Sequence, residues 1–170
     1  MELNKNIVLL GMMGSGKSTI GYLLSKKLDL KFKDIDKIIE KKANNKISEI
    51  FLSKGEEYFR KLEEKITIKI LNSEKNIIAL GGGAFINKNI RKEVLSKNLS
   101  FWLYWNSSTI INRISNNKKR PLAFNASNIE INELILSRSK IYSEADYKIN
   151  CEKLSKNMIV KKIIKIYEKK

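Results

Sequence analysis

One short motif constrains this chain more than any other feature of its sequence. Residues Gly11–Ser18 read GMMGSGKS and match the pattern G-x-x-x-x-G-K-[ST] at every fixed position. The motif follows the apolar run Asn6–Leu10 (NIVLL) and leads into Lys17–Leu28, where apolar side chains recur at helical spacing. A buried strand, a glycine-rich turn and a helix in this order form a site in which backbone N–H groups hold phosphate oxygens.

The residue types within the motif indicate a nucleoside triphosphate as the ligand. Lys17 can reach the β- and γ-phosphates, and the Ser18 hydroxyl is a ligand for Mg²⁺. We expect the ATP-binding residues of the motif to be Gly14, Ser15, Gly16, Lys17, Ser18 and Thr19. A glycine-rich turn beside a surface lysine is the alternative, but it does not account for the flanking strand and helix.

Further apolar runs alternate with amphipathic segments along the chain. Strands are predicted at Asn6–Leu10, Lys31–Asp34, Asn76–Leu80, Ser100–Trp105 and Asp146–Cys151. Helices are predicted at Lys17–Leu28, Asp36–Lys42, Ser48–Leu52, Glu56–Leu71, Lys88–Ser96, Ser107–Ser115, Glu130–Tyr142 and Leu154–Tyr167. The alternation predicts a three-layer α/β/α fold with a five-stranded parallel sheet, in a single domain over residues 1–170.

A pair of acidic residues and an Arg–Glu pair define a predicted acceptor-binding segment at about residues 34–63. Asp34 and Asp36 end the second predicted strand in an expected extended segment, and the two acids there can serve different ligands. Asp36 also suits the N-cap of the following helix, and the residues alone leave both readings open. Arg60 and Glu63 lie three apart on one helix, where a surface ion pair is the alternative.

Two further features point to the same chemistry. Gly81, Gly82 and Gly83 follow a buried strand, so their backbone can approach a small anionic or hydroxylated ligand, unless they form only a loose turn. The polar segment at about residues 115–128 contains Arg120 and is the predicted mobile lid. An arginine there can supply charge to a phosphoryl group in transfer, with a solvated basic loop as the alternative.

Composition excludes several classes of mechanism and partner. The chain has no histidine and one cysteine, Cys151, which excludes Ser-His-Asp and Cys-His catalysis, Cys/His zinc sites and an internal disulfide. The net charge of +16 comes from 34 basic residues, only five of them arginine, and the lysines are scattered as on a solvated surface. We therefore expect no nucleic-acid partner, no membrane partner and a reducing, cytoplasmic setting.

The ordered segments GMMGSGKST, DID, GEEYFRKLEE, LGGGA, KKRPL and SRSKIYSEADY resemble the shikimate kinase family. This family consists of small P-loop kinases of the aromatic amino-acid pathway, and the resemblance runs from about Ile7 to Asp146. It implies that the three-layer α/β/α fold is a P-loop kinase fold, with ATP and Mg²⁺ as cofactors, shikimate as the small-molecule partner and a monomeric enzyme. Another small-molecule P-loop kinase, of the gluconate or nucleoside-monophosphate type, is the alternative.

The resemblance also implies a role for each acceptor-side residue. Arg60 and Arg138 would grip the shikimate carboxylate, and Glu63 would orient Arg60. Asp36 would accept a hydrogen bond from the attacking hydroxyl. Gly81, Gly82 and Gly83 would close around the ring.

On the nucleotide side, the resemblance implies roles for three more residues. Asp34 would assist the metal through water, Arg120 would move with the lid onto the transferring phosphate, and Arg113 would lie near the adenine. The chain departs from the family pattern after the fifth strand, where Asn150–Asn157 contains no proline to cover the base.

Overall fold

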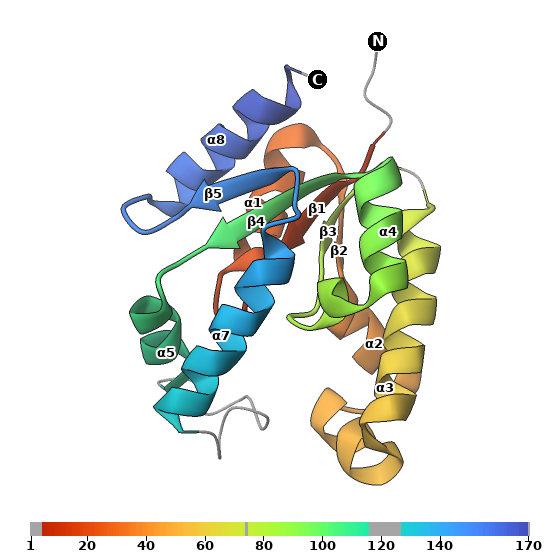
Figure 1. Ribbon diagram of the computed structural model, residues 1–170. Helices are drawn as coiled ribbons and strands as arrows, with labels where there is room; N and C mark the ends of the chain where they lie inside the picture. Colours follow the sequence, from red (N-terminus) through yellow and green to blue (C-terminus); the bar gives the residue numbers. More distant parts are fainter. Residues whose placement is uncertain (1–4, 74, 116–126, 170) are drawn as a thin grey trace.

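The fold is built on a parallel sheet whose first strand is apolar on both faces. The computed structural model describes residues 5–73, 75–115 and 127–169, and within these ranges the sheet has five strands (Figure 1). They are β1 (Ile7–Leu10), β2 (Lys31–Asp34), β3 (Asn76–Ala79), β4 (Leu99–Tyr104) and β5 (Tyr147–Asn150). All pairings are parallel and the order is β2-β3-β1-β4-β5, which confirms the predicted sheet and places β1 at its centre.

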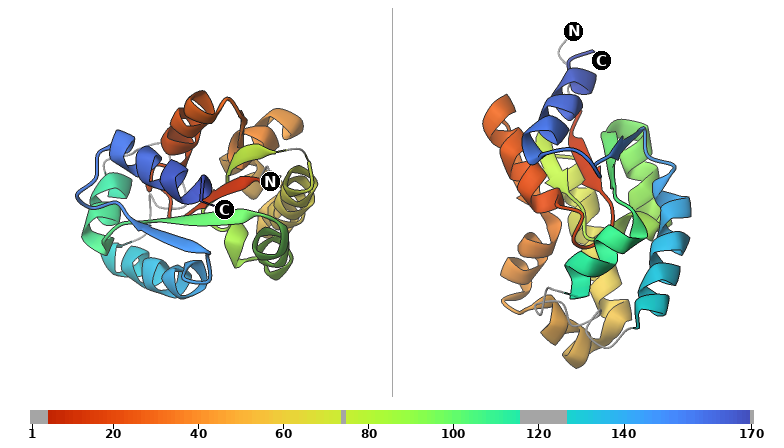
Figure 2. Two further views of the ribbon diagram at one scale, coloured as in Figure 1. Left: turned by 90° about the horizontal axis from the view of Figure 1, so that it is seen from above. Right: turned by 90° about the vertical axis from the view of Figure 1, so that its left-hand side faces the viewer.

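Helices cover both faces of this sheet. They are α1 (Lys17–Leu28), α2 (Ile35–Ala43), α3 (Ile47–Leu71), the 3-10 turn η1 (Ala84–Ile86), α4 (Lys88–Lys97), α5 (Ser107–Ser115), α7 (Asn128–Tyr142) and α8 (Lys156–Tyr167). Seen from above, α1 and α8 lie on one side of the sheet, and α4 and α7 lie on the other (Figure 2). No helix in the described ranges is both long and apolar enough to cross a lipid bilayer.

The apolar run of β1 explains the three layers. Successive side chains of a strand point to opposite faces, so Ile7 and Leu9 enter the core beneath α1 and α8, whereas Val8 and Leu10 enter the core on the other face. All four side chains are at most 1% exposed. A strand buried on both faces cannot alternate apolar with polar residues, which is why it reads as a continuous apolar run.

Two predicted boundaries change in the structure. The predicted helices Ser48–Leu52 and Glu56–Leu71 belong to one element, α3, which is kinked at Gly55 where the backbone has φ 81°. The helix predicted at Glu130–Tyr142 begins two residues earlier, because Ser127 caps α7 in a reciprocal pair with Glu130 and helix α7 starts at Asn128. Residues 116–126, including Arg120, lie outside the described ranges.

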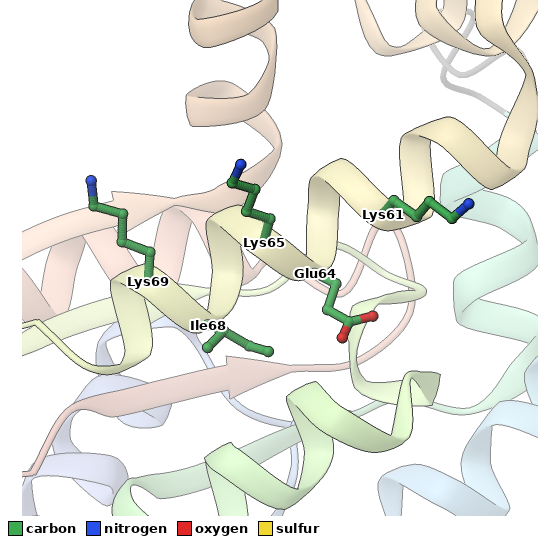
Figure 3. A pocket seen from close by; sticks show the side chains of 5 residues that line it. All are labelled: Lys61, Glu64, Lys65, Ile68 and Lys69. Atoms are coloured by element: carbon green, nitrogen blue, oxygen red, sulfur yellow. The ribbon is translucent and has the colours of Figure 1, made fainter.

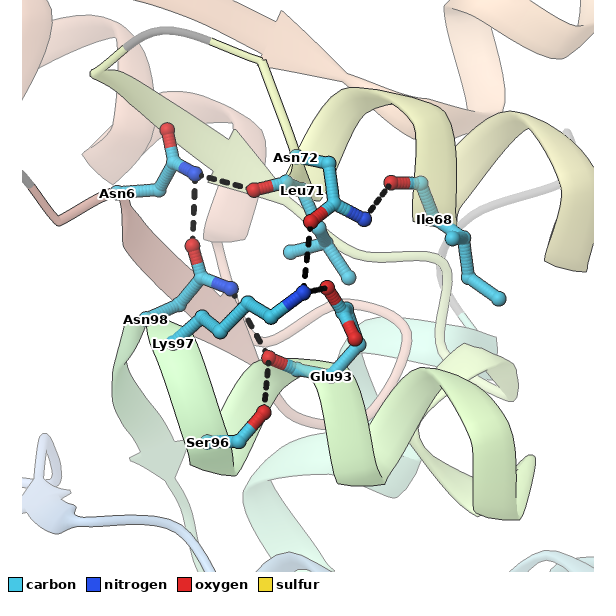
Figure 4. Close-up of polar contacts among 8 residues, drawn as sticks. All are labelled: Asn6, Ile68, Leu71, Asn72, Glu93, Ser96, Lys97 and Asn98. Atoms are coloured by element: carbon cyan, nitrogen blue, oxygen red, sulfur yellow. Dashed lines mark hydrogen bonds and ion pairs between the residues drawn. The ribbon is translucent and has the colours of Figure 1, made fainter.

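A cluster of amide side chains joins the amino ends of β1, β3 and β4, at the edge of the sheet opposite the glycine-rich loops. Asn6 donates through its amide nitrogen to the Leu71 carbonyl at 2.8 Å and to Asn98 Oδ1 at 2.6 Å, as Figure 4 shows. Its oxygen accepts from the backbone N–H of Asn76 at 2.7 Å. Because Asn6 is only 4% exposed, it satisfies buried groups on three elements that water cannot reach.

We predict that Asn6→Ala lowers the free energy of unfolding by roughly 2–3 kcal/mol, because it leaves buried donors and acceptors unpaired. Urea denaturation measures this loss. Asn72→Ala is the matched control, since Asn72 is exposed and its bonds to Ile68 and Lys97 lie at the surface. Equal losses in the two variants would contradict a specific role for Asn6.

Candidate active site

The glycine-rich loop between β1 and α1 has the backbone that its sequence predicts. Gly11 has φ 140°, and a Cβ there would lie 2.9 Å from the Leu103 carbonyl oxygen on β4. Gly16 forms the N-cap of α1 in the left-handed region, with φ 91°. Side chains at these two positions would be strained, so the tight loop requires glycine. Because Gly16 is the N-cap, the loop lies at the N-terminus of α1, where the helix dipole favours an anion.

Lys17 and Ser18 begin α1 and face different neighbours. The Lys17 ammonium donates to the carbonyls of Gly11 at 2.7 Å and Met12 at 2.9 Å, so it lies across the loop itself. The Ser18 hydroxyl donates to Asp34 Oδ2 at 2.6 Å. The predicted nucleotide lysine and the predicted metal-binding oxygens thus lie at the same end of α1.

The structure assigns different neighbours to the two acids of the Asp34–Asp36 pair. Asp34 is the N-cap of α2 and accepts from the Lys37 backbone N–H at 3.3 Å. Capping by Asp36, one of the two readings of the sequence, is therefore wrong. The expected extended geometry is wrong too, because α2 begins directly at Ile35 and carries Asp36 into its first turn. The two carboxylates face different groups, because Asp34 accepts from Ser18 whereas Asp36 faces Gly81.

Gly81 is the point where the acidic side chains of α2 and α3 converge. A Cβ on Gly81 would lie 2.7 Å from Asp36 Oδ1 and 2.7 Å from Glu63 Oε1. Any larger residue would push at least one carboxylate away. The turn is not loose, because the Gly81 carbonyl accepts from Ala84 and the Gly83 carbonyl accepts from Ile86, each at 3.1 Å. The carboxylates therefore pack directly against the backbone.

Arg60 and Glu63 form a partly buried ion pair, with the carboxylate buried and the guanidinium about one-third exposed, rather than a surface pair. Arg60 Nη1 donates to Glu63 Oε2 at 2.7 Å, and Glu63 is 2% exposed. Burial raises the pKa of Glu63, with the nearby Asp36 carboxylate adding to the rise and the Arg60 guanidinium opposing it. Arg60 Nη1 also lies 2.7 Å from the position of a Cβ on Gly83, so the guanidinium contacts the turn that holds Gly81.

Arg138 reaches the same turn from α7. Its Nη1 lies 3.6 Å from the position of a Cβ on Gly82 and 4.0 Å from the Met12 sulfur. That same Cβ position lies 3.4 Å from the backbone nitrogen of Met13. The glycine turn therefore abuts the phosphate-binding loop, and Arg138 lies at the junction.

Tyr142 contributes to this junction, although sequence reasoning gave it no function. Its hydroxyl donates to the Gly82 carbonyl and lies 3.8 Å from the Met12 sulfur. The side chain is 1% exposed, and burial raises the pKa of its phenol to about 12. The available signal was its position four residues after Arg138, which places both side chains on one face of a helix.

Trp105 and Arg113 contact the phosphate-binding loop from outside. Trp105 Nε1 donates to the Ser15 carbonyl at 2.9 Å, and Arg113 Nη1 donates to the Gly14 carbonyl at 3.1 Å. The Arg113 guanidinium stacks on the Trp105 indole, 3.7 Å from the ring centroid. Arg113 thus lies on the nucleotide side of the site, apart from the group formed by Arg60 and Arg138, and sequence reasoning gave Trp105 no role.

A hollow on the outer face of α3 does not belong to this site. It is lined by Lys61, Glu64, Lys65, Ile68 and Lys69, and Figure 3 shows Lys65 and Lys69 pointing away from the side to which Glu64 and Ile68 point. Glu64 accepts hydrogen bonds from Asn87 and Asn89 at 2.7 Å each, which ties α3 to the start of α4. This hollow contains none of the predicted site residues.

The phosphate-binding loop, the sheet order and the loops at the carboxyl ends of the strands define a P-loop kinase. Within this class, the Gly81–Gly83 turn with Arg60, Glu63 and Arg138 is the arrangement that the sequence resemblance to shikimate kinases predicted. The chain belongs to the shikimate kinase family, whose model, described as "Shikimate kinase", matches residues 13–168.

Individual relatives agree with this assignment. The chain is 41% identical over 160 residues to the shikimate kinase of Sulfurihydrogenibium sp. (strain YO3AOP1), covering 94% of this chain and 96% of that protein. It superposes on the structure of shikimate kinase from Acinetobacter baumannii in complex with shikimate with a TM-score of 0.92, at 29% identity over 99% of this chain and 95% of that one. A gluconokinase from Sinorhizobium meliloti 1021, at 13% identity and a TM-score of 0.61, with 99% of this chain and 97% of that chain covered, shares the fold alone.

We predict that the Tyr142 phenol makes stability depend on alkaline pH. A pKa raised from 10.0 to about 12 means that the folded state favours the neutral phenol, so this contribution is complete below pH 10 and is lost as the pH rises toward 12. By pH 11 the loss amounts to about 1.4 kcal/mol. Urea unfolding at pH 9 and pH 11 should show that much extra loss in the parent relative to Tyr142→Phe. The same pH dependence in both proteins would contradict the burial argument.

Proposed function

We propose that this chain transfers the γ-phosphate of ATP to the 3-hydroxyl of shikimate, giving shikimate 3-phosphate and ADP. The observation that carries the proposal is the close approach of the Gly81–Gly83 turn to the phosphate-binding loop, where a Cβ on Gly82 would lie 3.4 Å from the Met13 backbone nitrogen. It brings a phosphate site and a site for a small hydroxylated anion together without intervening residues. Proximity of this kind accounts for much of the rate enhancement in phosphoryl transfer.

The nucleotide side uses backbone donors and the ammonium group of one lysine. Gly14, Ser15 and Gly16 lie in the loop before α1, and the N–H groups at such a helix start bind phosphate oxygens. The Lys17 ammonium, which now contacts two loop carbonyls, would exchange these contacts for the β- and γ-phosphates. Thr19 follows in the first turn of α1 and completes the proposed set within the motif.

The residues Ser18 and Asp34 fit a magnesium ion. Both offer oxygen ligands, and their oxygens already lie 2.6 Å apart. Mg²⁺ in kinases uses one or two protein ligands together with waters and phosphates, which agrees with the lack of any cluster of three acidic, His or Cys groups among the described residues. When bound, Mg²⁺ neutralises charge on the β- and γ-phosphates.

On the acceptor side, two arginines and one carboxylate match the two ends of the substrate. Arg138 and Arg60 offer planar donors to a carboxylate, and both lie against the Gly81–Gly83 turn. Asp36 accepts a hydrogen bond from the attacking hydroxyl and orients it. Because a loose transition state removes the hydroxyl proton late, Asp36 acts mainly by positioning. Glu63 holds Arg60 in place through the 2.7 Å ion pair.

Arg113 and Arg120 complete the nucleotide side of the proposal. Arg113 is exposed and stacked on Trp105 beside the loop, where its outer face is open to a nucleobase. Arg120 lies outside the described residues, and its role on the transferring phosphate rests on the family resemblance. We also infer a reducing cytoplasmic setting and a monomer; the buried free thiol of Cys151 supports the first.

A substrate panel with coupled detection of ADP tests the proposal. We expect ADP release with shikimate and none above background with gluconate or nucleoside monophosphates. Lys17→Ala is the control for contaminating activity, and it should lower turnover by at least about 100-fold because charge on the phosphoryl oxygens loses its nearest cation. ADP release with another acceptor but not with shikimate would refute the proposed substrate.

We predict that Arg138→Lys raises the KM for shikimate roughly tenfold, because an ammonium group cannot form two parallel hydrogen bonds to a carboxylate. The KM for ATP, measured on the same preparation, is the internal control and should change by less than about twofold. Steady-state kinetics with each substrate varied in turn gives both values. Equal changes in the two constants would contradict a carboxylate-binding role.

A further inference from the structure

Two consecutive carbonyl groups of the phosphate-binding loop are held by side chains from outside the motif. The Gly14 carbonyl accepts from Arg113 at 3.1 Å, and the Ser15 carbonyl accepts from Trp105 Nε1 at 2.9 Å. Both donors come from the connection that follows β4 or from α5. The loop is thus fixed on the side that faces away from its own N–H donors.

Trp105 is the better anchored of the two donors. Its indole packs against both hydrophobic clusters of the protein, one on each face of the sheet. It directly follows β4, whose residue Leu103 closely approaches Gly11 at the other end of the loop. Arg113, by contrast, is exposed and gains its orientation by stacking on the indole at 3.7 Å.

The planar trans peptide converts the Trp105 hydrogen bond into a constraint on a phosphate donor. The described residues contain no cis peptide bonds, so the N–H of Gly16 points opposite to the carbonyl of Ser15 in the same peptide unit. Holding that carbonyl toward Trp105 directs the Gly16 N–H away from it. Gly16 has φ 91° and no side chain, so little else within the residue restricts the direction of this N–H.

We propose that Trp105 is a positioning residue for nucleotide binding: its indole N–H fixes the Ser15–Gly16 peptide so that the Gly16 N–H is oriented for a phosphate oxygen before the ligand arrives. The stacked Arg113 holds the Gly14 carbonyl and so fixes the Gly14–Ser15 peptide in the same way. This inference rests on the proposed function only in taking a nucleotide as the ligand. Preorganised donors bind more tightly because less ordering entropy is lost on binding.

The test compares Trp105→Phe with the parent by calorimetry, using ADP and inorganic tripolyphosphate as separate probes. Phenylalanine keeps an aromatic face for Arg113 and removes only the donor and part of the ring. We expect the Kd of both probes to rise about fivefold, the effect of one lost hydrogen bond. In steady-state assays the KM for ATP should rise by the same factor, while the KM for shikimate stays within about twofold.

Two further variants keep the result interpretable. Tyr104→Phe removes a hydrogen bond to Asn106 in the same connection without touching the loop, and it should leave both Kd values unchanged. Arg113→Lys alters an exposed residue, so it should fold even if Trp105→Phe does not, and it should weaken tripolyphosphate binding through the loss of the forked guanidinium.

The outcomes separate this inference from the proposed function. Parent-like binding of both probes by Trp105→Phe and Arg113→Lys would overturn the positioning role while leaving the kinase assignment intact. Weaker binding of ADP with unchanged binding of tripolyphosphate would also overturn it, because Trp105 would then act on the base. A parent protein that binds no ADP would contradict the proposed function itself.

Discussion

The contact of the Gly81–Gly83 turn with charged side chains is the constraint on which the site depends. Asp36, Glu63 and Arg60 all lie within 2.7 Å of positions that a Cβ would occupy on Gly81 or Gly83. Because these glycines carry no side chains, α2, α3 and the β3 turn can meet at one place. The same turn approaches the phosphate-binding loop at Gly82, so backbone packing sets the distance between the donor and acceptor subsites that we propose. Backbone packing is more rigid than a contact between long side chains, as catalysis by positioning requires.

The charged side chains at this junction differ in how far they are buried and in how they are paired. A buried carboxylate is costly unless it is paired, and Glu63 is paired with Arg60 at 2.7 Å. That pairing compensates much of the charge of Arg60. In the proposed function, Arg138, which reaches the turn from the other side, is then the cation that attracts the anionic substrate. In the proposed function, Glu63 therefore acts on substrate recognition through Arg60, without having to touch the substrate.

The parts of the site that the sequence predicted are those encoded by local patterns. The GMMGSGKS motif fixes its own loop, because strained glycine positions and the start of a helix occur within eight residues. The pairing of Arg60 with Glu63 follows from helical spacing. Its burial does not, since burial depends on how β3 and its turn pack against α3. The capping of α2 by Asp34 was missed because the helix starts one residue earlier than the apolar pattern indicated.

Other parts of the site could not be read from the chain because they depend on distant contacts. Tyr142 meets Gly82 across 60 residues, and Trp105 meets Ser15 across 90. Each appears in the sequence as an ordinary aromatic residue at the end of a predicted element. The polar end of each ring finds a backbone carbonyl only after the sheet order brings the carboxyl ends of β1, β3 and β4 together.

The contrast between arginine and lysine connects the composition with these contacts. Arg60 binds Glu56 and Glu63, Arg91 binds two carbonyls and Glu144, Arg113 binds Gly14 while stacking on Trp105, and Arg138 lies between Met12 and Gly82. Each of these four arginines engages at least two groups, a task that suits a planar guanidinium with several donors. The lysines of α3, such as Lys61, Lys65 and Lys69, are exposed on the outer face of the helix instead. The chain has 29 lysines and five arginines, so a position that keeps arginine indicates a contact that needs the planar guanidinium. The net charge of +16 comes mainly from the lysines of the solvated surface.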